Sequence, residues 1–93
     1  NILIDVKIVD DKEVKNLVMT EYPCVKEMHK IRSRGTKNNV FMDMHIQVDP
    51  KMTVEESHRL MHNIERTIQK NIEENAHVII HIEPYSNNKN ITG

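Results

Sequence analysis

The sequence contains few aromatic residues, few glycines and prolines, and a single cysteine. Among 93 residues there are one Phe, two Tyr and no Trp, so the core must be aliphatic and rich in methionine. Cys24 has no partner for an internal disulfide, which suits a reducing compartment. No apolar run reaches the length of about 18 residues that a membrane helix needs, so this chain is expected to be soluble.

The charge is almost balanced. Thirteen basic and fourteen acidic residues leave a formal net charge of −1. A nucleic-acid platform needs clustered Lys and Arg with stacking aromatics, so no nucleic-acid partner is expected. A solvated hairpin accounts for the one basic group, which comprises Lys26, Lys30, Arg32, Arg34 and Lys37.

The length corresponds to one domain. A chain this short buries only about 60–65% of its unfolded surface, so support from a partner subunit or a metal is plausible. Because the sequence begins at Asn1 without a signal peptide, we expect a fragment of a longer protein. Residues 1–9 are interpreted as a linker or short strand from an upstream domain, 10–84 as the domain, and 85–93 as a disordered tail.

Capping signals and alternation of apolar residues define the elements. Asp10 or Asp11 caps a first helix, and Thr53 with Glu56 forms a capping box before a second. The pattern predicts, in order, a helix of about ten to twelve residues that ends at Pro23, strands over 25–34 and 40–48, a helix over 54–71 and a strand over 76–83. This order predicts an α+β two-layer sandwich, with both helices on one face of a three-stranded mixed sheet.

The face of the sheet without helices is predicted to carry histidines and a carboxylate. A right-handed crossover places the last strand parallel to the second, so His45 and His81 share this open face. Glu83 follows His81 on the same face, about 7 Å along the strand. A hairpin centred near Lys37 puts His29 opposite His45.

These groups predict a metal site. Three imidazoles and a carboxylate suit Zn²⁺, and also Mn²⁺, Fe²⁺, Co²⁺ or Ni²⁺. His58, at the edge of the second helix, would have to reach the end of the sheet to join them. Three further candidates are Asp43, His77 and His62.

Simpler interpretations stay open. A histidine on a strand is more often a surface residue than a ligand, and His62 is expected on a solvated helix face. His58 and His62, four residues apart, could also chelate an ion by themselves. No enzyme activity is expected, because the sequence has neither a nucleophile elbow nor a phosphate loop, and Arg59 replaces the glutamate of the zinc-protease HExxH motif.

Four motifs in a fixed order carry a family resemblance. They are Val25-Lys-Glu-Met-His29-Lys-Ile-Arg32-Ser-Arg34, Phe41-Met-Asp-Met-His45-Ile-Gln-Val-Asp49, Thr53-Val-Glu-Glu-Ser-His58 and His81-Ile-Glu83-Pro84. With this order, residues 5–84 resemble the cytoplasmic C-terminal domain of cation diffusion facilitator transporters.

The resemblance implies a ferredoxin-like, metallochaperone-like αββαβ fold that forms a homodimer. It also implies a six-helix membrane domain of the same polypeptide, which exports divalent cations. The implied cytosolic metal ligands match His29, His45, His58, His81 and Glu83, with Zn²⁺ as the main cation and Cd²⁺ among the alternatives. Some members of the family have Asp where this sequence has Glu83.

The expected function is therefore regulatory: metal bound near the dimer interface favours a closer arrangement of the subunits and promotes transport. One alternative is a dimerisation module that binds no metal. Another is a free-standing metallochaperone-like protein or metal-dependent enzyme of similar fold.

Overall fold

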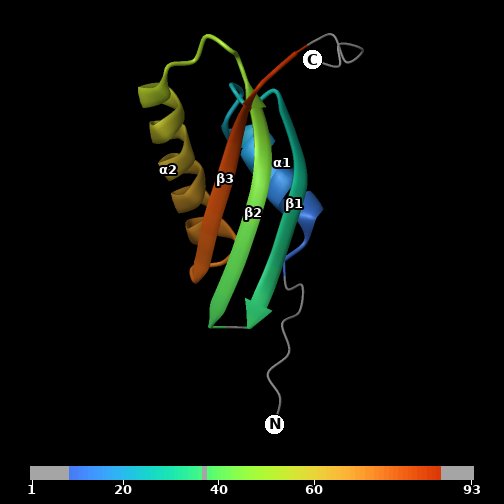
Figure 1. The fold of residues 1–93 in the computed structure, drawn as a ribbon. Helices are drawn as coiled ribbons and strands as arrows, with labels where there is room; N and C mark the ends of the chain where they lie inside the picture. Colours follow the sequence, from blue (N-terminus) through green and yellow to red (C-terminus); the bar gives the residue numbers. More distant parts are fainter. Residues whose placement is uncertain (1–8, 37, 87–93) are drawn as a thin grey trace.

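The computed structural model describes residues 9–36 and 38–86, and its elements follow the predicted order. They are α1 (Asp11–Glu21), β1 (Glu27–Thr36), β2 (Asn39–Val48), α2 (Val54–Asn71) and β3 (Ala76–Pro84). The sheet order is β1-β2-β3, with β1 antiparallel and β3 parallel to the central strand β2. Both helices lie behind the sheet in Figure 1. The predicted α+β two-layer architecture is confirmed.

The core lies between the helices and the inner face of the sheet. Every second residue of β2 is buried there, and Met44 and Ile46 have no exposed surface. Val14 and Val18 from α1 and Ile64 and Ile68 from α2 are also fully buried. The core is aliphatic and methionine-containing, as the scarcity of aromatic residues predicts.

The helix ends and the helix pair are fixed by polar contacts. Asp10 accepts a hydrogen bond from the Lys12 backbone N–H, and the predicted capping box of Thr53 and Glu56 is present. Because the Glu56 carboxylate accepts the backbone N–H of Thr53, its pKa is lowered. The Tyr22 hydroxyl, just after α1, lies 2.6 Å from the Thr67 hydroxyl on α2. The Tyr22–Thr67 contact therefore links the two helices, and the caps fix where each helix begins.

Strand β1 departs from regular alternation at a β-bulge. His29 pairs with His45, but the next pair in register is Arg32 with Asp43, so β1 has one extra residue there. Lys30, inside the bulge, has a φ of 53°. The bulge allows His29 and Arg32, three residues apart, to lie on the same open face of the sheet. This explains why the first strand alternates less regularly than the second.

We expect Lys30→Gly to stabilise the chain by about 0.5–1 kcal/mol, because glycine adopts positive φ without the steric cost that lysine has there. Urea unfolding followed by circular dichroism measures the change. Lys26→Gly is the matched control, since Lys26 is exposed and is not among the described positive-φ residues. An unchanged or lowered unfolding free energy for Lys30→Gly would show that the bulge is not strained.

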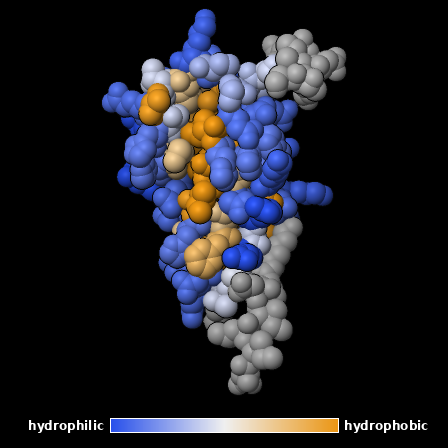
Figure 2. All heavy atoms as spheres, in the orientation of Figure 1, coloured by the Kyte–Doolittle hydropathy of each residue, from blue (hydrophilic) through white to orange (hydrophobic). Residues whose placement is uncertain are grey.

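Figure 2 views the open face of the sheet, where an apolar band follows the direction of β3 between hydrophilic flanks. Phe41 and Ile79 are the large hydrophobic residues on this face with the most exposure, at 49% and 63%. Within the described residues, no helix is long and apolar enough to cross a membrane. The interpretations of the two chain ends lie almost entirely outside the described residues, although Val9 is buried and Tyr85 donates a backbone hydrogen bond to Val48.

Candidate metal centre

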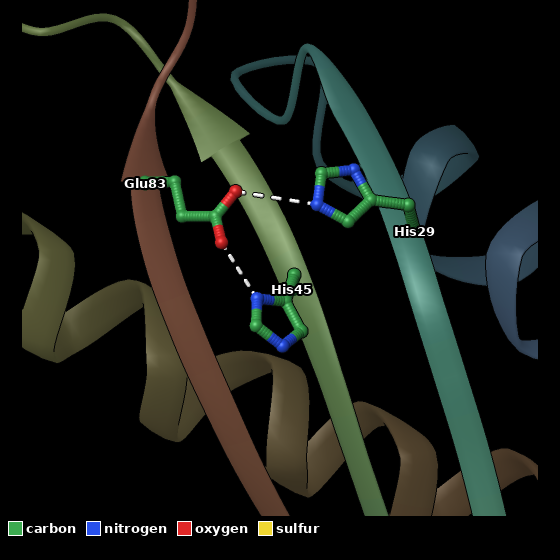
Figure 3. Close-up of side chains that lie close together, drawn as sticks. All are labelled: His29, His45 and Glu83. Carbon is green, nitrogen blue, oxygen red and sulfur yellow. Dashed lines mark hydrogen bonds and ion pairs between the residues drawn. The ribbon is translucent and has the colours of Figure 1, made fainter. Parts of the chain in front are cut away.

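Three side chains from three strands converge on the open face: His29 from β1, His45 from β2 and Glu83 from β3 (Figure 3). The two carboxylate oxygens of Glu83 contact different imidazoles. Oε1 lies 3.2 Å from His29 Nε2, and Oε2 lies 2.6 Å from His45 Nδ1. The carboxylate therefore lies between the two rings.

The register of the sheet produces this convergence. His29 pairs with His45 across the antiparallel ladder, and His45 pairs with His81 across the parallel one. Glu83 lies two residues beyond His81, on the same face and level with Gln47. Its side chain extends back from that position to reach both imidazoles. A carboxylate at this position is thus within reach of histidines on both β1 and β2.

The site is partly exposed and favours the ionised carboxylate. The hydrogen bond from His45 is the main cause that lowers the pKa of Glu83, and a hydrogen bond from Gln47 lowers it further. Partial burial opposes this effect, but the balance remains a lowered pKa. The side chains of His29, His45 and Glu83 keep 39%, 21% and 34% of their surface exposed, so an ion can reach them from solvent.

The lowered pKa of Glu83 predicts an acid-sensitive contribution to stability in the metal-free chain. A carboxyl whose pKa is lower when folded stabilises the fold above its unfolded pKa of about 4.3, and this stabilisation is lost as the pH falls through the folded value. The unfolding free energies of the wild type and Glu83→Gln should therefore differ most above the unfolded pKa and converge as the pH falls through the lowered folded pKa. Urea unfolding at a series of pH values measures this, and a constant difference would contradict it.

The donor set fits a divalent cation. One ligand atom from each of the three residues lies within 4.8 Å of the others. Two imidazole nitrogens and a carboxylate oxygen are ligands that Zn²⁺ accepts, with water in a further position. The 2.6 Å contact between His45 and Glu83 holds a proton that an ion would replace. Ion binding at this site would therefore compete with protons.

His81 lies next to the group of three but does not join it. Its ring stacks on that of His45, with centroids 4.5 Å apart and an interplanar angle of 14°. The His29 ring lies on the other side of His45, at 5.6 Å. The three imidazoles thus form a row across the sheet, and His81 could offer a ring nitrogen to the same ion only after its side chain rotates.

The other four candidate ligands lie in different contacts. His58 and His62 contact each other on α2, with 3.1 Å between their Nε2 atoms, rather than the group on the sheet. Asp43 lies on the open face as predicted, but it accepts a hydrogen bond from Arg32. His77 stacks on Phe41, with ring centroids 5.1 Å apart.

Two residues near the site were not identified from the sequence. Arg32 neutralises Asp43, and Gln47 contributes a hydrogen bond to Glu83. Gln47 could have been found, because it lies two residues beyond His45 and therefore on the same open face. Arg32 could not be placed reliably, since its direction depends on the bulge in β1.

The fold and the site together define a class of protein: a small α+β domain that presents a histidine–carboxylate group on an open sheet face. Residues 6–85 match the family model described as the cytoplasmic domain of cation efflux proteins. The chain belongs to this family, which confirms the resemblance read from the four motifs.

Curated relatives include whole transport proteins. The chain is 37% identical over 60 residues to metal tolerance protein C1 of Arabidopsis thaliana, which covers 64% of the chain. It is 26% identical over 69 residues to the cation-efflux pump FieF of Pectobacterium atrosepticum, which covers 74% of the chain. The matches span only 13% and 23% of those two proteins, so the chain corresponds to a small part of each.

Solved structures agree on the fold. The metal-bound C-terminal domain of the CzcD transporter from Thermotoga maritima is 31% identical, with a TM-score of 0.69 over 78% of this chain and 85% of that one. The MamB C-terminal domain from Desulfamplus magnetovallimortis has a TM-score of 0.72 at 14% identity, over 83% and 94% of the two chains, a likeness of fold alone. The predicted ferredoxin-like fold is thereby confirmed.

Proposed function

We propose that this chain is the regulatory and dimerisation domain of a divalent-cation efflux transporter, and that it senses the cytosolic cation through His29, His45 and Glu83. The observation that carries the proposal is the convergence of these three ligand atoms from three different strands. Family membership supports the transport context. The metal-bound structure of the CzcD domain supports cation binding by a domain of this fold.

Zn²⁺ is the cation we favour, because it combines imidazole and carboxylate ligands at a coordination number of four. His29, His45 and Glu83 supply three positions, and His81 after rotation, or water, supplies the fourth. Mn²⁺, Fe²⁺, Co²⁺, Ni²⁺ and Cd²⁺ are alternatives that the same donor types accept. In the proposed full-length transporter, the membrane domain of the same polypeptide would receive the regulatory signal.

The open face also offers a surface for a second copy of the chain. Phe41 and Ile79, both well exposed, lie at the end of this face away from Glu83, and the His77 ring covers part of Phe41. We infer that two copies pair through Phe41 and Ile79. This pairing places the candidate metal ligands of each copy beside the interface. The ionised Glu83 would then place negative charge beside the interface, and a bound cation would offset that charge.

A cation shifts the arrangement of two subunits only by its difference in affinity for the open and the closed form. We expect saturating Zn²⁺ to reduce the radius of gyration of the dimer in small-angle X-ray scattering. Ile79→Glu places like charges in the inferred interface, so it should convert the dimer to monomers in sedimentation velocity while each chain still binds Zn²⁺.

Two outcomes would refute this regulatory function. A scattering profile of the dimer that does not change at saturation would show that the cation has no conformational effect. Zn²⁺ binding no tighter than about 100 µM in calorimetry would favour the alternative, a dimerisation module independent of metal. One observation supports this alternative: the hydrogen bond between His45 and Glu83 gives both side chains a partner without an ion.

A further inference from the structure

Strand β1 contains a strained residue directly beside a candidate metal ligand. Lys30 follows His29 and has a φ of 53°, a conformation that lysine rarely adopts because its Cβ crowds the following carbonyl oxygen. It forms the β-bulge with Ile31, so that these two residues oppose Met44 alone on β2. Backbone strain of this kind is concentrated at functional sites, where the surrounding structure maintains it.

The fold does not need the extra residue. Every described pair between β1 and β2 would remain if Lys30 were absent, because Ile31 alone would then oppose Met44. Regular alternation would also return, since Ile31 already packs against the core and Met28, which precedes His29, is buried. The helix-facing side of the sheet therefore gives no reason for the strain, and the reason lies on the open face.

His29 extends across the central strand to reach Glu83. Neighbouring strands are about 4.8 Å apart, so β1 and β3, with β2 between them, are separated by about twice that distance. The Nε2 atom of His29 lies only 3.2 Å from Glu83 Oε1, and Figure 3 shows the ring directed from β1 toward Glu83. A bulge bends its strand, increases the local twist and can redirect a side chain near a functional site.

We propose that the bulge at Lys30 is a positioning element for the cation site, which turns His29 toward Glu83 before an ion arrives. This inference rests on the proposed function, since the ion it serves is the one held by His29, His45 and Glu83. Lys30 acts through His29 and is a positioning residue, because its ammonium group has no lone pair to offer a cation. With the ring already oriented, the ion does not have to order it on binding.

The test compares two variants that both lack the lysine charge. Lys30→Gly keeps the extra residue, and glycine adopts positive φ freely, so calorimetry with ZnCl₂ should give a Kd within about threefold of the wild type. Deletion of Lys30 removes the bulge and leaves a regular ladder, so the Kd should rise about 10- to 100-fold, as when a ligand loses the group that orients it. Urea unfolding should show that the deletion variant is no less stable than the wild type, which separates lost positioning from lost structure.

A double-mutant cycle shows whether the effect passes through His29. In a His29→Ala background, deletion of Lys30 should change the Kd by less than about threefold, because the side chain that the bulge orients is absent. A change of about tenfold or more in that background would overturn the positioning role. A deletion variant that binds Zn²⁺ as tightly as Lys30→Gly would overturn it as well.

A substitution repeats the comparison if the deletion variant does not fold. Lys30→Val keeps the chain length, but a β-branched residue strongly disfavours positive φ. Its Kd for Zn²⁺ should therefore exceed that of Lys30→Gly at least about fivefold. Equal Kd values for these two variants would show that the conformation of residue 30 does not orient His29.

A measurement without metal separates this proposal from the proposed function. In long-range ¹H–¹⁵N correlation spectra of the metal-free chain, deletion of Lys30 should move the His29 Nε2 resonance, because the contact with Glu83 is lost, and leave the His45 Nδ1 resonance in place. A wild type that binds no Zn²⁺ would refute the proposed function, and the His29 resonance would still decide whether the bulge orients this ring. An unchanged His29 resonance would refute the positioning role even where Zn²⁺ binds.

Discussion

Replacing Glu83 with alanine is expected to weaken Zn²⁺ binding at the sheet site by at least about 100-fold. Loss of a residue that only supports a ligand typically costs 10- to 100-fold in affinity, and Glu83 is proposed as a direct ligand. Its carboxylate also contacts both His29 and His45, at 3.2 and 2.6 Å. Its removal leaves two imidazoles without the anion that lies between them. Isothermal titration calorimetry with ZnCl₂ measures the loss.

Two matched variants sharpen this experiment. His77→Ala removes a histidine from the same strand, but His77 stacks on Phe41 outside the group, so affinity should change less than about threefold. Glu83→Asp keeps the charge and shortens the side chain by one methylene. Because some family members have Asp at this position, it should retain most of the affinity lost in Glu83→Ala. Equal losses in Glu83→Ala and His77→Ala would falsify the assignment of Glu83 as a ligand.

The elements could be predicted from local signals in the sequence. Strand β2 alternates strictly between buried and partly exposed residues, and the capping box of Thr53 and Glu56 fixes the start of α2. The parallel pairing of β2 with β3 follows from the handedness of a crossover through one helix. These features depend on chain chirality and on burial of one face, which short stretches of sequence encode directly.

The bulge in β1 could not be predicted in the same way. An extra residue in one strand is specified by its pairing partner, and Lys30 is not a residue that favours positive φ. The position of Arg32 beside Asp43 depends on this bulge. The sequence predicted His29 opposite His45 from a hairpin centred near Lys37. The pairs nearest the turn are shifted by one residue from that register, and the extra residue in the bulge brings His29 back opposite His45. The sequence gave no account of Arg32.

The candidate site was predicted only in part, for a similar reason. Alternation and register place His45, His81 and Glu83 on one face, but they do not determine side-chain rotamers. The rotamer of His81 stacks its ring on the neighbouring imidazole of His45, and the register alone does not specify that rotamer. The direction of His58 depends on how α2 rotates against the sheet, and burial of Leu60, Ile64 and Ile68 fixes that rotation.

Gly35→Ala is expected to destabilise the chain by at least about 3 kcal/mol, because backbone strain and a steric clash coincide at this position. Gly35 has a φ of 135°, and a Cβ there would lie 2.0 Å from the Asn39 carbonyl oxygen. Gly35 pairs with Val40 where the hairpin closes, so the strands cannot separate locally without disturbing their register. For a domain of this size, the Tm should fall by more than about 12 °C.

The matched control for Gly35→Ala is Asn38→Ala. Asn38 is an exposed residue of the same turn and is not among the described residues with positive φ. Its replacement should change the unfolding free energy by less than about 0.5 kcal/mol. Differential scanning calorimetry of both variants and the wild type makes the comparison. The same register places His29 opposite His45, so a hairpin that relaxes around the new methyl group should also weaken Zn²⁺ binding. If Gly35→Ala melted within about 3 °C of the wild type, the close contact of Gly35 with Asn39 would not fix the hairpin. The register of the metal ligands would then have to depend on the bulge at Lys30 and the packing of β2.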